Sequence, residues 1–206
     1  GQLDDTLILF SADHGELLGD FYSFGKRSYH DAASRIPLLA RYPRDYAAGG
    51  RCDTPVSLLD IPATMLAAAG ATLKTHTPDG VDLAQVAGQG GDRTVFSQLG
   101  RAGDAIYTAV NKRWKFVYSA PDQRELLFDR VMDPGETKDL AQVKGAIARD
   151  RRAEMQQWLR ACGQEDAFTG DGWRPYPKLA LPPNPDAGLI YQDHPWAKQH
   201  IPGYSD

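Results

Sequence analysis

The first half of the chain alternates short apolar runs with polar turns. Residues 6–10 are an unbroken run of β-branched and apolar side chains, which predicts a strand buried on both faces, as in parallel sheets. Residues 29–35 are expected to form a short helical turn that leads into a second strand at 36–42. Apolar residues at helical spacing over 57–69 predict a helix packed on the sheet, whereas 72–92 are expected to be loop.

The second half has the two-residue periodicity of antiparallel strands, followed by one amphipathic helix. Runs at 106–110 and 114–118 flank a polar turn and predict a hairpin, with further strands at 94–99 and 126–129. Over 144–161 apolar residues recur at helical spacing with charges between them. This helix is expected to cover the small antiparallel sheet.

Composition narrows the classes of function. The 206 residues carry a net charge of −4 at pH 7 without a basic run, so nucleic-acid binding has no electrostatic support. No apolar stretch approaches membrane-spanning length. The two cysteines, Cys52 and Cys162, do not indicate a disulfide framework, although a single bridge stays open. The sequence does not distinguish a cytoplasmic from a periplasmic or secreted location.

Residues suited to metal and anion binding cluster where the first predicted strand ends. Asp13 and His14 follow the apolar run, and Gly15 lets the backbone turn. In α/β proteins ligand sites gather outside the carboxyl ends of strands. A carboxylate beside an imidazole can bind one divalent cation, and a Gly-containing loop can bring Lys26 back to hold an anion there. A strand-end Asp also commonly caps the following turn, so the triplet Asp-His-Gly alone is a weak signal.

The triplet lies within a longer string whose order and spacing are more specific. Residues 11–20 read S-A-D-H-G-E-L-L-G-D, followed by Gly25-Lys26 and by S-R-I-P-L at 34–38. This arrangement resembles the late metal motif of the sulfatase family, in the alkaline-phosphatase superfamily. Later segments resemble later parts of that family in the same order: 57–70, 78–83, 113–118 and 127–140.

The resemblance implies an α/β fold: part of an alkaline-phosphatase-like sheet with covering helices, plus a small C-terminal antiparallel sheet with one helix. It assigns residues 1–92 to the C-terminal part of the α/β core and 93–162 to a small α+β subdomain. Residues 163–206 are rich in Pro, Gly and aromatic side chains and are not covered by it. They are expected to form an extended tail along a surface.

The resemblance also implies roles for individual residues. Asp13 and His14 would be metal ligands, with calcium as the family's usual ion and manganese as an alternative that suits an imidazole. Lys26 would be catalytic and bind a sulfate oxygen. His30, just after the lysine loop, could reach the substrate or could be an ordinary hydrogen-bonded histidine. The family's nucleophile is a formylglycine made from Cys or Ser in the pattern C/S-x-P-x-R.

That nucleophile pattern is missing from this sequence. Neither Cys52 nor Cys162 fits it, and Ser119 comes closest but has Gln123 where Arg is needed. We therefore expect the nucleophile in an N-terminal half of a longer chain, and no turnover by these 206 residues alone. The implied partners are that N-terminal half and a sulfate-ester small molecule or glycan, with homo-oligomerisation left open.

Two alternatives stay open. The Asp-His-Gly-Glu version at 13–16 also resembles phosphonate monoester and phosphodiester hydrolases of the same superfamily, and Phe21 stands where many relatives have His. The missing nucleophile also allows a non-catalytic fragment or interaction module. The sequence decides neither the natural ester nor the metal.

Overall fold

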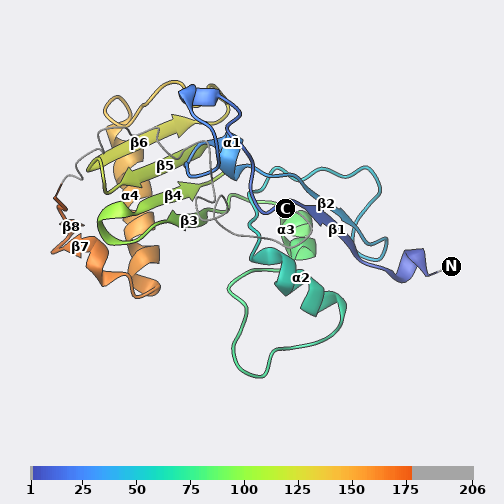
Figure 1. Ribbon diagram of the computed structural model, residues 1–206. Coiled ribbons are helices and arrows are strands. Elements are labelled where there is room, and N and C mark those ends of the chain that lie inside the picture. Colours follow the sequence, from blue (N-terminus) through green and yellow to red (C-terminus); the bar gives the residue numbers. More distant parts are fainter. Residues whose placement is uncertain (1, 178–206) are drawn as a thin grey trace, which may run out of the picture.

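The computed structural model describes residues 2–177 (Figure 1). Its N-terminal part consists of two short strands, short helices and long loops. The elements of this part, with 3-10 helices written η, are η1 (Leu3–Asp5), β1 (Ile8–Ser11), η2 (Asp20–Tyr22), α1 (Asp31–Ser34), β2 (Leu38–Arg41), α2 (Asp60–Ala68) and α3 (Leu83–Gln89). The C-terminal part is a sheet with one long helix and a small hairpin. Its elements are β3 (Val95–Leu99), η3 (Ala102–Asp104), β4 (Ile106–Val110), β5 (Trp114–Ser119), β6 (Arg124–Asp129), α4 (Gly145–Ala161), η4 (Glu165–Ala167), β7 (Phe168–Thr169) and β8 (Gly172–Trp173).

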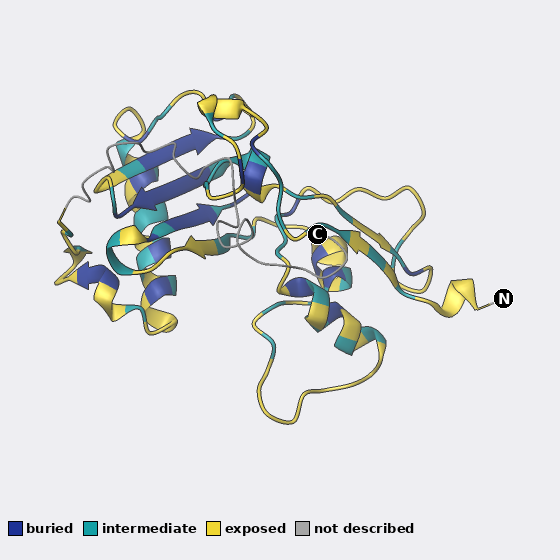
Figure 2. Ribbon diagram, in the orientation of Figure 1, coloured by how far each residue is buried: buried dark blue, intermediate teal, exposed yellow. Residues whose placement is uncertain are grey.

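β1 and β2 form an antiparallel pair in which Ile8 lies opposite Arg41. Leu9 is half-buried, whereas Ile8 and Phe10 on the other face of β1 are exposed, Phe10 by 60% (Figure 2). The two strands were predicted correctly, but parallel pairing and burial on both faces were wrong for the described residues. An apolar run is buried on both faces only where a layer packs on each of them. Within residues 2–177 the sheet of β1 has β2 as its second strand and leaves one face open.

A buried ion pair fixes the start of α2. Asp60 is fully buried, and its carboxylate accepts hydrogen bonds from the N–H groups of Ser57 and Val81 and from both terminal nitrogens of Arg93. Burial raises the pKa of Asp60, but the hydrogen bonds from Arg93, Ser57 and Val81 outweigh it and hold the pKa below its usual value. One side chain thus joins α2 to two later loops.

α3 corrects the expectation that residues 72–92 are all loop. The Asp82 side chain accepts a hydrogen bond from the Ala84 N–H at 3.0 Å and so caps the helix. Leu83 and Val86 are buried, and the helix packs against α2. Seven residues with a glycine among them are too few for a clear helical period, so contact with α2 stabilises a helix that the pattern does not reveal.

A four-stranded antiparallel sheet in the order β3-β4-β5-β6 forms the largest core. The long helix α4 packs on one face of it (Figure 1). This arrangement confirms the predicted hairpin, its two neighbouring strands and the amphipathic helix. The fully buried centre of this core consists of Tyr107, Phe116, Leu127, Met155 and Leu159.

The opposite face of this sheet contacts the segment that carries α1. Side chains alternate along a strand, so Lys115 and Val117 point away from the face that α4 covers. Val117 packs with Leu126, Phe128 and the half-buried Tyr29, two residues before α1. The Lys115 ammonium donates to the Asp31 carboxylate. The sheet is therefore the platform against which the N-terminal segment is held.

Part of the expected tail is folded. β7 and β8 form a short hairpin, and the Trp173 ring stacks on Tyr118 with 3.9 Å between ring centroids. The Trp173 Nε1–H donates to the Glu125 carboxylate at 2.6 Å. An extended tail from residue 163 onward was thus wrong for 165–173, because a half-buried indole packed against the sheet holds a hairpin there. The rest of that expectation, residues 178–206, lies outside the described residues.

Two smaller findings concern the cysteines and the helices. Cys52 and Cys162 are both free and exposed. Among the helices of residues 2–177, none is both long and apolar enough to span a bilayer.

Candidate functional site

The turn after β1 is fixed by close backbone contact with α1. The Gly15 N–H donates to the Ala33 carbonyl at 2.8 Å, and the Glu16 N–H donates to the Ala32 carbonyl at 3.0 Å. A Cβ at position 15 would lie 2.0 Å from the Ala32 carbonyl oxygen, so only glycine fits. Asp13 and His14 are therefore presented at the carboxyl end of β1, as the sequence predicted.

The lysine loop folds back onto the same turn. The Leu17 N–H donates to the Gly25 carbonyl at 2.9 Å, and the Gly25 N–H donates to the Glu16 carboxylate. Gly25 has a φ of 90°, in the left-handed region that favours glycine. Lys26 follows directly and is brought back toward His14.

Three side chains meet at this point. Lys26 Nζ lies 2.5 Å from His14 Nε2, and Asp13 Oδ2 lies 3.4 Å from the same nitrogen. His14 Nδ1 lies 2.7 Å from the Gly15 carbonyl, which can only accept, so Nδ1 carries the proton. His14 Nε2 consequently offers a lone pair, and the Lys26 ammonium donates to it. The structure brings together the three residues that the sequence singled out.

The donor set fits two positions of a divalent-metal site. A carboxylate oxygen and an imidazole lone pair face each other, and the Asp13 side chain is 84% exposed. The Nδ1–H bond to Gly15 fixes the tautomer in which Nε2 can bind a cation, a common arrangement around metal-binding histidines. Residues 2–177 contain no group of three or more His, Cys, Asp or Glu placed for a metal. These two side chains would therefore supply part of a coordination sphere.

His30 lies in a different environment. Its Nδ1 is 3.3 Å from the Glu136 carboxylate, and its ring stacks on Phe21 with 3.5 Å between centroids. This is the hydrogen-bonded alternative for His30, and the side chain is largely buried. Contact between His30 and a substrate stays a prediction.

The sequence pattern did not predict the buried carboxylate that lies beside His30. Glu136 accepts from the Asp31 N–H at 2.7 Å and from the fully buried Lys115. Burial raises the pKa of Glu136, but the hydrogen bond to His30 and the charge and hydrogen bond of Lys115 dominate and lower it to about 2. The one available signal was Lys115 itself, a charged residue inside an otherwise apolar, alternating strand.

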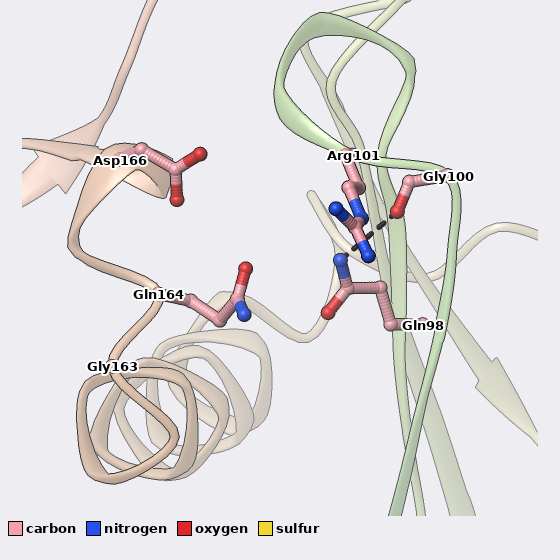
Figure 3. Close-up of a pocket in the computed structure, with 6 residues that line it drawn as sticks. All are labelled: Gln98, Gly100, Arg101, Gly163, Gln164 and Asp166. Atoms are coloured by element: carbon pink, nitrogen blue, oxygen red, sulfur yellow. Dashed lines mark hydrogen bonds between the residues drawn. The ribbon is translucent and has the colours of Figure 1, made fainter.

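The described cavities lie elsewhere. A polar hollow of about 710 Å³ lies between the turn after β3 and the end of α4, lined by Gln98, Gly100, Arg101, Gly163, Gln164 and Asp166 (Figure 3). A more apolar hollow of about 590 Å³ lies between β1 and α2, with Leu9, Ile61 and Met65 among its lining residues. Neither has Asp13, His14 or Lys26 among its lining residues.

Comparisons with known proteins identify the family of the chain. The Sulfatase family model matches residues 1–71. The choline-sulfatase of Rhizobium meliloti (strain 1021) is 38% identical over 146 residues, which cover 68% of this chain and 28% of that protein. Arylsulfatase K of Xenopus laevis is 30% identical over 176 residues, covering 78% of this chain and 32% of the relative. The chain thus spans about a third of the length of these curated relatives.

Solved structures of related proteins share the fold of this chain. The phosphonate monoester hydrolase SpPMH from Silicibacter pomeroyi superposes with a TM-score of 0.63 at 28% identity, over 87% of this chain and 40% of that one. The α/β fold and the matches together place the chain in the alkaline-phosphatase superfamily. Within that superfamily, the chain belongs to the sulfatase family.

Proposed function

We propose that this chain supplies the metal ligands and the anion-binding lysine of a sulfuric-ester hydrolase. The observation that supports it is the meeting of the Asp13 carboxylate, the lone pair of His14 Nε2 and the Lys26 ammonium at the end of β1. Asp13 and His14 would hold a divalent cation, calcium first and manganese second. The metal, when bound, would polarise a sulfate oxygen and offset charge that develops on the transferring group.

Lys26 would change its partner when the site is complete. His14 Nε2 has a single lone pair, so it cannot accept from Lys26 and bind a cation together. The released ammonium has three donors on a flexible stem, and a sulfate oxygen beside the metal is the natural acceptor. Lys26 would then stabilise negative charge on the peripheral oxygens of the transition state. The substrate is a sulfate ester of a small molecule or glycan.

The nucleophile would come from another part of a longer protein. This sequence contains no C/S-x-P-x-R, and we propose that a formylglycine in an N-terminal half completes the site. The exposed side chains of Ile8, Phe10 and Leu39 on the β1–β2 sheet suit a surface that such a half would cover. Sequencing the parent gene upstream of Gly1 tests this: an in-frame C/S-x-P-x-R supports the proposal, and its absence refutes catalysis by this protein.

Metal binding can be tested on the chain itself. We expect calcium or manganese at millimolar concentration to raise its melting temperature, and Asp13→Asn and His14→Gln to abolish the shift. His76→Gln is the matched control, because His76 is exposed and bonds only the neighbouring Thr75 among the contacts of the described residues. A melting temperature that ignores both metals would show that the isolated chain binds neither, and would favour the non-catalytic fragment.

A second candidate is a phosphonate monoester or phosphodiester hydrolase. The likeness to the Silicibacter pomeroyi structure named for that activity favours it, together with an imidazole at the second ligand position. Turnover of an aryl sulfate and of an aryl phosphonate monoester by the parent protein would separate the two candidates. The ester cleaved with the higher kcat/KM identifies the substrate class.

A further inference from the structure

A buried group of charged side chains joins α1 to the C-terminal sheet, outside the candidate metal site. Lys115 projects from β5 and donates to Asp31 at 2.6 Å and also to Glu136, which lies in the loop after β6. Lys115 is fully buried and Glu136 nearly so. Charges buried this deeply persist when each has partners, which is the case here.

Glu136 acts on the backbone as well as on side chains. One of its oxygens accepts the Asp31 N–H at 2.7 Å and lies 3.3 Å from His30 Nδ1. These contacts fix the first residue of α1 and the residue before it. At four residues, α1 is too short to be stable without tertiary contacts, so this carboxylate holds it in place.

The same short helix holds the turn of the candidate site. The carbonyls of Ala32 and Ala33 accept the N–H groups of Glu16 and Gly15. The Gly15 carbonyl in turn accepts from His14 Nδ1, and the Glu16 carboxylate accepts from Gly25, next to Lys26. A continuous path of hydrogen bonds therefore runs from Lys115 on the sheet to His14 and Lys26.

We propose that Glu136 and Lys115 are positioning residues for this site: through α1, they set the turn that presents His14 and the lysine loop. The proposal depends on the proposed function in one respect: that the turn carries the metal ligand His14 and leads into the loop of the anion-binding Lys26. The Glu125 carboxylate binds Arg152 and Trp173 and makes no hydrogen bond or ion pair with α1 among residues 2–177, so it gives the matched comparison.

Residue-resolved amide hydrogen exchange on the 206-residue chain tests the proposal, because it needs neither metal nor substrate. We expect Glu136→Gln to speed exchange of the Gly15 and Glu16 amides about tenfold relative to the Phe116 amide in the sheet core. A residue that only stabilised the subdomain would change all three amides in proportion. Glu125→Gln should behave in that second way.

Equal effects at the turn and in the sheet for Glu136→Gln would overturn the proposal, as would no effect at Gly15 and Glu16. If Glu136→Gln does not fold, Asp31→Asn replaces one charged partner of Lys115 with a neutral acceptor and keeps Glu136, and a roughly threefold local increase is expected in its place. Unchanged exchange at Gly15 in a folded Asp31→Asn protein would equally refute the path. Failure of the metal test leaves these exchange outcomes intact, so the two proposals fail separately.

Discussion

Replacing Asp60 by Ala tests the energetic account of the N-terminal part most directly. Asp60 is fully buried and accepts four hydrogen bonds, two from Arg93 and one each from the Ser57 and Val81 N–H groups. Breaking a buried ion pair by removing one partner costs about 3–5 kcal/mol, because the remaining charge is left unpaired. Each buried N–H that loses its acceptor adds about 1–3 kcal/mol where water cannot reach it.

Two features of the structure reduce that sum. The Arg93 side chain is 27% exposed, so its guanidinium can turn partly to water once Asp60 is gone. Water that enters the space left by the carboxylate can also accept from the Ser57 and Val81 N–H groups. We therefore expect Asp60→Ala to lower the free energy of unfolding by about 3 kcal/mol. Asp60→Asn should cost less, since the amide oxygen keeps one acceptor for the backbone.

Urea unfolding followed by circular dichroism measures this change. The matched control is Asp4→Ala, which breaks an exposed pair with Arg41 and should cost less than about 1 kcal/mol. A loss below about 1 kcal/mol for Asp60→Ala would refute the view that this pair holds α2 and its neighbouring loops together. Since the folded pKa of Asp60 is lowered, its contribution is present above its usual pKa and is lost as pH falls through the folded value.

Three further outcomes are expected. Calcium or manganese at a hundredfold excess over Kd should add about 2.7 kcal/mol of stability to the native chain and none to Asp13→Asn, measured by thermal melts. Gly15→Ala should displace the turn from α1, since its Cβ would meet the Ala32 carbonyl at 2.0 Å; loss of the metal-dependent shift would show this, and a retained shift would contradict it. The pKa of Glu136 is lowered from 4.5 to about 2, so its contribution is full above 4.5 and is lost as pH falls toward 2. The stability difference between native chain and Glu136→Gln should shrink over that range, and a constant difference in acid titrations would contradict it.

Much of the fold followed from local patterns. The alternation over 106–118 predicts the β4–β5 hairpin, and the helical period over 144–161 predicts α4. Both periodicities can be recognised within a short stretch of consecutive residues, without knowledge of the tertiary contacts. α3 was missed because seven residues do not show a period, and its stability comes from α2. The hairpin at 168–173 was not predicted because it depends on the stacking of Trp173 on Tyr118, a residue far away in the sequence.

The sequence by itself determined which side chains lie together at the end of β1. Asp13, His14 and Lys26 are set by a strand that ends, a glycine turn and a loop that returns, all within one short stretch of chain. Only the tertiary structure decided the tautomer of His14, the bonded state of His30 and the burial of Glu136 against Lys115. These features depend on contacts between residues as much as 106 positions apart, such as His30 and Glu136. Tertiary packing brings such partners together, and no local sequence pattern predicts the contact.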